Sequence, residues 1–159
     1  MIGRILVALD GSTRAPGVFA AATEVAYRFS SILHVMRAVQ VPPEFPAAAA
    51  GVLADPLPGY LVDAALEDLT RLTAGGRDST VKVAPLVVRV GEAWRVILEV
   101  SEELDVDLIV LGSHGYGTLD RILGTTAGRV ANIANRNVYV VHERLDRLKP
   151  PISASAPYR

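Results

Sequence analysis

The sequence contains no cysteine, which excludes disulfide bridges, thiolate zinc sites and cysteine nucleophiles. It also lacks any apolar run near the roughly 20 residues that a membrane-spanning helix needs, and the short run after Met1 is too brief for a secretory signal. Its basic residues form no block or stripe, and the formal net charge is -1. We therefore expect a soluble cytoplasmic protein that binds neither nucleic acid nor a membrane surface.

The amino-acid composition is typical of a globular protein with a packed core. Half of the 159 residues are hydrophobic, which is enough to form the core of one α/β domain. We expect this single domain to span residues 1–142. The segment 143–159 is polar, contains prolines and shows no periodicity, so we expect a loosely ordered tail.

Two apolar runs, residues 4–9 and 108–111, are typical of parallel strands buried on both faces. Further strands are expected at 32–39, at 81–90 and at 137–141, and Pro85 places the second of these at a sheet edge. Helices are expected after each of the first four strands. The first should carry Ala15, Phe19, Ala22, Ala26 and Phe29 on its inner face, with Ser12 or Thr13 as the N-cap, and the second should run from about 55–58 to Gly75.

Strands alternating with helices indicate a doubly wound parallel sheet with helices on both faces. We expect five strands in the order 3-2-1-4-5. In such a sheet ligands bind at the carboxyl ends of the strands, where the strand order reverses. The turn at Asp10 and the loop after Gly112 should then face one cleft.

A glycine-punctuated loop follows the strand at 108–111. Gly112, Gly115 and Gly117 come in quick succession, and Gly124, Thr125 and Thr126 open the next helix. Bare backbone N–H groups and the positive end of a helix suit an anion such as a phosphate. Neither the dinucleotide fingerprint nor the Walker A pattern is present, so a plain strand–loop–helix corner remains the alternative.

The segment 40–58 is unusual because it contains five prolines and the run from Ala47 to Ala50. A structureless loop of this length is uncommon inside a compact domain. Three interpretations stay open: a functional flap, a partly helical excursion or a mobile segment.

Several stretches together resemble the universal stress protein family. They are ILVALDGS at the start, LHV in the second strand, DLIVLGSHG, the helix start GTTA, and the last strand VYVV. The resemblance extends from Arg4 to His142 and implies the same 3-2-1-4-5 sheet. It also implies a homodimer through the edge strand from Val138 to Val141. No proline or inward charge in this strand blocks its pairing with a second copy.

One branch of that family binds ATP through the pattern G-x2-G-x9-G-[ST]. Gly112 and Gly115 match its first two glycines and Gly124 with Thr125 its last pair, but the eight residues from Tyr116 to Leu123 make the loop one residue shorter. The resemblance implies ATP as the ligand. Because a direct contact between a carboxylate and a phosphate is repulsive, we expect Asp10 to face ribose hydroxyls or to reach a phosphate only through Mg²⁺. The implied contact residues are Ala8, Leu9, Asp10, Val35, Gly112, Ser113, His114, Gly115, Tyr116, Gly117, Gly124, Thr125, Thr126 and Ala127.

No catalytic constellation is visible in the sequence. His114 has no carboxylate partner nearby, Ser12 and Ser113 lie in no nucleophile elbow, and the three histidines show no metal-ligand spacing. We expect at most a slow ATPase. Two hypotheses follow: a dimeric ATP-binding regulatory protein of the stress response, or a nucleotide-free dimeric module that binds unidentified protein partners.

Overall fold

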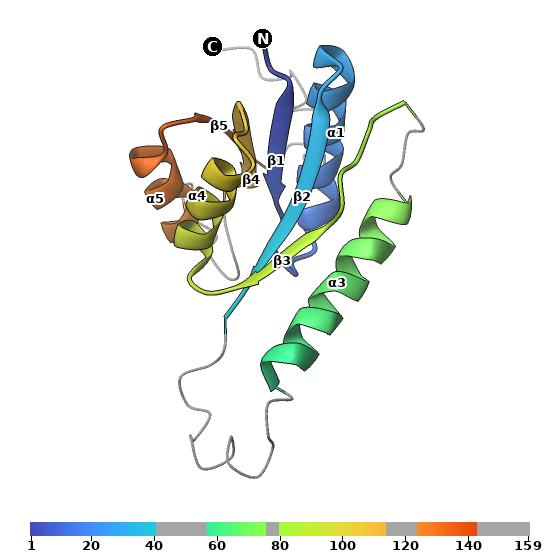
Figure 1. The fold of residues 1–159 in the computed structure, drawn as a ribbon, viewed down its shortest axis with the longest axis vertical. Helices are drawn as coiled ribbons and strands as arrows, with labels where there is room; N and C mark the ends of the chain where they lie inside the picture. The colour runs from blue at the N-terminus through green and yellow to red at the C-terminus, as the bar shows by residue number, and fades with distance from the viewer. Residues whose placement is uncertain (41–56, 76–79, 114–123, 143–159) are drawn as a thin grey trace, which may run out of the picture.

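The computed structural model describes residues 1–40, 57–75, 80–113 and 124–142. Within them, the strands form one parallel sheet in the order β3-β2-β1-β4-β5, which confirms the predicted topology (Figure 1). The elements are β1 (Arg4–Ala8), α1 (Ala15–Phe29), β2 (Ile32–Val39), α3 (Leu57–Gly75), β3 (Val87–Val90), α4 (Ala93–Glu103), β4 (Leu108–Gly112), α5 (Thr125–Ile133) and β5 (Asn137–Val141).

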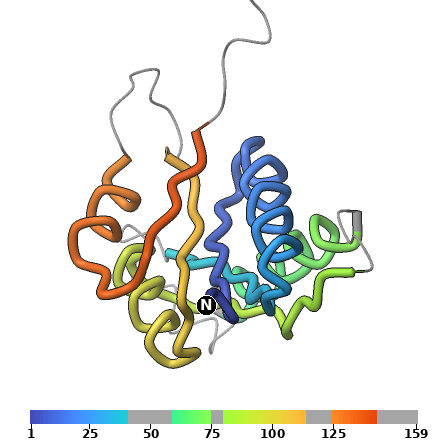
Figure 2. The backbone as a smooth tube through the Cα atoms, turned by 90° about the horizontal axis from the view of Figure 1, so that it is seen from above, coloured from blue at the N-terminus to red at the C-terminus, as the bar shows by residue number. Residues whose placement is uncertain are grey.

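The helices cover both faces of the sheet, as predicted. Figure 2 shows α1 on one side of the strands and α4 with α5 on the other. Side chains of β1 alternate between these layers: Ile5 and Val7 pack with α1 and with Leu69 of α3, whereas Leu6 packs with α4 and α5. The sheet therefore has two cores, one on each face.

The strands β1 and β4 lie at the centre, and their apolar side chains are buried on both faces. Each such side chain contributes about 1.5–3 kcal/mol relative to its exposed state. The two strands pair in register, with Ala8 opposite Leu111. Because both strands run in the same direction, the turn at Asp10 and the chain after Gly112 leave the sheet side by side.

The strand predicted over 81–90, interrupted by Pro85, is confirmed at the sheet edge. Strand β3 begins only at Val87, after Pro85, and Val83 makes an isolated bridge to Leu33. The Leu33 N–H donates to the Lys82 carbonyl and the Leu33 carbonyl accepts from Ala84, each at 2.9 Å. The proline lacks an N–H group, so the ladder is interrupted there.

Two details of α1 also differ from the prediction. Its N-cap is Arg14 and no side chain caps the helix, since Ser12 lies two residues before the N-cap and its hydroxyl accepts from the Arg14 N–H. Phe29 is 53% exposed rather than buried. It is the last residue of the helix, and the chain turns away directly after it through Ser30, whose φ is 52°.

The predicted bounds of α3 are confirmed, and its inward face contains the buried residues Ala65 and Leu69. The predicted flap (40–58) falls outside the described residues except at its ends, and the predicted tail (143–159) falls outside them entirely. Among the helices in the described part of the chain, none is long and apolar enough to cross a bilayer.

Candidate functional site

A cavity of about 340 Å³ lies at the carboxyl ends of β1 and β4. Its walls come from both sides of the sheet: the start of α1 on one side, and the starts of α4 and α5 on the other. The volume is at the lower end of the range for small-molecule sites. The cavity is therefore at the switch point that the strand order predicts.

Most of the predicted contact residues that the structure describes line this cavity. These are Ala8, Leu9, Asp10, Gly112, Ser113, Gly124, Thr125, Thr126 and Ala127. His114, Gly115, Tyr116 and Gly117 lie outside the described residues. The glycine loop and the Asp10 turn, far apart in the sequence, thus meet at one site.

Val35 does not line the cavity. It is fully buried in the core beneath α1 and pairs with Val7 in the middle of the sheet. Strand β2 extends beyond the end of β1, since Ala8 pairs with Met36, so β2 reaches the cavity through Ala38 and Gln40. This register was not visible in the sequence.

The start of α5 forms the polar wall. Gly124 is the N-cap, with φ -56° and ψ 157°, and no side chain caps the helix. Its N–H donates to the Ser113 carbonyl at 2.7 Å, and its carbonyl accepts from Gly128 at 2.8 Å. The first-turn N–H groups of a helix have no intrahelical acceptor, so Thr125, Thr126 and Ala127 present donors and a partial positive charge here.

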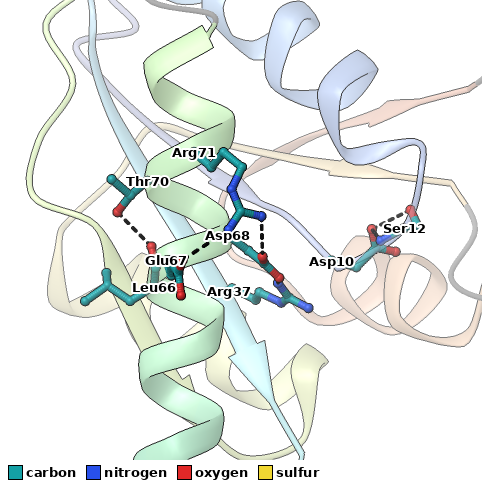
Figure 3. Close-up of polar contacts among 8 residues, drawn as sticks. All are labelled: Asp10, Ser12, Arg37, Leu66, Glu67, Asp68, Thr70 and Arg71. Atoms are coloured by element: carbon teal, nitrogen blue, oxygen red, sulfur yellow. Dashed lines mark hydrogen bonds and ion pairs between the residues drawn. The ribbon is translucent and has the colours of Figure 1, made fainter.

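The opposite wall is the turn between β1 and α1. One Asp10 carboxylate oxygen, Oδ1, accepts from the Ser12 N–H at 3.0 Å and from its hydroxyl at 2.6 Å (Figure 3). The Ser12 hydroxyl oxygen accepts from the Arg14 N–H at 3.3 Å. Asp10 therefore holds this turn in shape, whatever else it contacts.

Sequence reasoning missed several lining residues. Arg14 brings a cationic side chain to the cavity, and Val18, Ala93 and Ile97 add apolar surface. Ile97 is buried on α4, and its place in the cavity depends on how that helix packs against the sheet. The sequence does hold a signal for Arg14, since it lies two residues after Ser12, at the end of the turn expected at the switch point.

A second recess, also about 340 Å³, lies on the α3 side and shares Asp10, Ser12 and Ala15 with the cavity. Figure 3 shows its charged residues: Arg37 contacts Asp68 at 3.2 Å, and Arg71 contacts Asp68 at 3.3 Å and Glu67 at 3.2 Å. Both guanidinium groups are paired with carboxylates. The Arg37–Asp68 pair ties α3 to the carboxyl end of β2, and the two Arg71 pairs lie within α3.

The described residues offer no metal centre: nowhere in them do three or more histidine and carboxylate side chains cluster. Asp10 is the only carboxylate among the described residues that line the cavity. A hard cation such as Mg²⁺ takes six oxygen ligands, which this wall does not supply from side chains. The cavity is suited to an anion with an apolar portion.

A model of the universal stress protein family matches residues 1–142. The chain belongs to this family. The family member "Universal stress protein A homolog 1" of Coxiella burnetii (strain RSA 493 / Nine Mile phase I) is 31% identical over 139 residues, covering 86% of this chain and 94% of that protein.

Solved structures of the family share the fold. The universal stress protein UspA from Lactobacillus plantarum is 25% identical with a TM-score of 0.73, covering 88% of this chain and 97% of that one. A universal stress protein solved in complex with cAMP is 23% identical with a TM-score of 0.59, covering 89% of this chain and 97% of that one.

Proposed function

We propose that this universal stress protein binds an adenine nucleotide in the cavity at the ends of β1 and β4 and acts as a dimeric regulatory protein. The observation that carries the proposal is the start of α5, which no side chain caps and which faces the cavity. Such a helix start is a ready-made phosphate site. The hydroxyl groups of Thr125 and Thr126 would add hydrogen bonds to the phosphates.

The rest of the cavity suits the base and the sugar. Val18, Ile97 and Leu111 provide buried apolar surface against which a flat ring can pack. Asp10 would accept from ribose hydroxyl groups through Oδ2, the oxygen that does not bind Ser12. The relative solved with cAMP supports an adenine nucleotide as the ligand class.

We assign no catalytic residue, and we propose that hydrolysis is slow or absent. Ser12 and Ser113 line the cavity, but no histidine stands beside them among the described lining residues. Asp10 already accepts two hydrogen bonds from Ser12, which makes it a turn-forming group rather than a poised base. General acid–base catalysis needs a titratable group within hydrogen-bond reach of the reacting atom.

The first test is to denature freshly purified protein, identify any released small molecule by mass spectrometry, and titrate the emptied protein with ATP by calorimetry. We expect adenine nucleotide or a micromolar dissociation constant, about 8 kcal/mol of binding free energy. The variant Gly124→Val should lose binding, because a branched side chain at the N-cap blocks close approach to the helix start. Gly128→Ala is the matched control, since a Cβ there meets no atom within 4 Å.

Unchanged affinity in a folded Gly124→Val variant would refute this placement of the phosphates. If the wild type releases no nucleotide and gives no heat, the second hypothesis replaces the first. The chain would then be a nucleotide-free interaction module, and the search should move to protein partners.

We propose that the dimer forms through β5, which among the described strands pairs with β4 alone. An edge strand presents unpaired N–H and C=O groups that a second copy can extend. Tyr139 is 42% exposed on this strand and offers apolar surface to that partner. Sedimentation that shows only monomer at micromolar concentration would remove the dimer from the proposal.

A further inference from the structure

Arg14 is the cationic side chain among the described residues that line the cavity. It is half-buried and lies at the N-cap of α1, on the wall that faces the start of α5. Arg14 thus stands on the wall of a cavity that the N-terminal ends of three helices, α1, α4 and α5, border. Each helix start adds roughly half a positive charge.

The backbone of Arg14 is held from both sides. Its N–H donates to the Ser12 hydroxyl at 3.3 Å, and its carbonyl accepts from the Val18 N–H at 3.1 Å. Ser12 is in turn held by two hydrogen bonds to Asp10. The guanidinium therefore projects from a fixed point, which lowers the entropy cost of using it to bind a ligand.

The charge balance of the described lining favours ligands with several negative charges. Arg14 and Asp10 cancel formally, so the helix starts leave a net positive potential. The attraction grows with the charge of the ligand. Adenosine is neutral and cAMP carries a single phosphodiester charge, whereas ADP and ATP carry a polyphosphate chain.

We infer that Arg14 determines ligand specificity, by binding the distal phosphates of a nucleoside polyphosphate while the start of α5 binds the proximal ones. This inference rests on the proposed function and adds to it the number of phosphates that the site selects. A guanidinium pairs with phosphate oxygens in a bidentate fashion, which gives geometric selection as well as charge.

The test is calorimetric titration of the full chain with ATP, ADP, cAMP and adenosine, using wild type, Arg14→Gln and Arg28→Gln. The last variant removes the same charge from the far end of the same helix, where Arg28 is exposed and paired with Glu24. At 1.5 Å per residue these two positions are about 20 Å apart along α1. Circular dichroism confirms that each variant is folded.

We expect Arg14→Gln to weaken ATP and ADP binding at least about tenfold, the usual effect of losing a hydrogen bond to a charged group. Its affinity for cAMP and adenosine should change by less than about threefold, and Arg28→Gln should match wild type for every ligand. Raising the salt concentration should weaken ATP binding less in Arg14→Gln than in wild type, because one screened charge is absent.

Three other results would overturn the inference, and they are distinguishable. If the wild type binds none of the four ligands, the proposed function fails and the inference fails with it. If the wild type binds ATP and Arg14→Gln has the same affinity, the function stands and Arg14 has no part in specificity. If Arg14→Gln weakens all four ligands equally, the residue only shapes the wall of the cavity.

Discussion

Replacing Gly91 by alanine should destabilise the protein, because this residue has a backbone conformation that side chains rarely allow. It joins β3 to α4 with φ at 150°, and its N–H donates to the Val39 carbonyl at 2.9 Å. A Cβ at this position would lie 2.7 Å from Cγ2 of Val96, closer than real contacts permit. Both the backbone and the neighbouring side chain would have to move.

The expected cost has two parts. Forcing a residue with a Cβ into this region of φ and ψ costs about 1–3 kcal/mol. Displacing Val96, which is buried in the core beneath α4, adds about 1 kcal/mol as an overpacking effect. The free energy of unfolding should fall by about 2–4 kcal/mol, which lowers Tm by about 5–15 °C for a chain of this size.

Urea denaturation followed by circular dichroism measures the change, with Gly17→Ala as the matched control. Gly17 lies inside α1, and a Cβ there meets no atom within 4 Å. The same substitution should therefore stabilise the protein by about 0.5–1 kcal/mol, since alanine is the better helix former. If Gly91→Ala is as stable as wild type, the reasoning from φ and the Val96 contact is wrong.

Three further changes test other parts of the structure. Burial, followed by the charge of Arg4, lowers the pKa of His34 below its ordinary value of 6.5, so the unfolded chain takes up the proton first and wild-type stability should fall as pH drops below that value. Urea denaturation of His34→Gln at about pH 5.5 and 7.5 should show a smaller loss of stability at the lower pH. A loss equal to that of wild type would contradict the role of His34. The backbone N–H groups of Arg4 and Gly3 lower the pKa of Asp107, so the stability they give is present above pH 3.8 and is lost as pH falls through the folded-state pKa. The variant Asp107→Asn should have a lower Tm at pH 7, and its Tm should depend less on pH in the acid range. An unchanged Tm would show that these hydrogen bonds do not stabilise the fold. Tyr139→Lys places a charge on the exposed edge of β5. In sedimentation it should convert the proposed dimer to monomer, without lowering the Tm of the monomer. A persistent dimer would place the interface elsewhere.

The sequence alone determined the layout of the sheet and the place of the site. Apolar runs at 5–9 and 108–111 indicate burial on both faces, and glycines follow both runs closely. Alternating strands and helices then allow few topologies, because crossovers between parallel strands are right-handed. The turn at Asp10 and the chain at Gly112 were expected at one cleft for this reason, and both residues line the cavity.

Only the tertiary structure decided which side chains face that cleft. The register of β2 against β1 puts Val35 in the core and brings Ala38 and Gln40 to the cavity. The packing of α1 turns Arg14 toward the cavity and leaves Phe29 exposed. Local sequence patterns predict which residues are buried and where the chain turns. Strand register and the direction of a helix end depend instead on contacts between residues far apart in the chain.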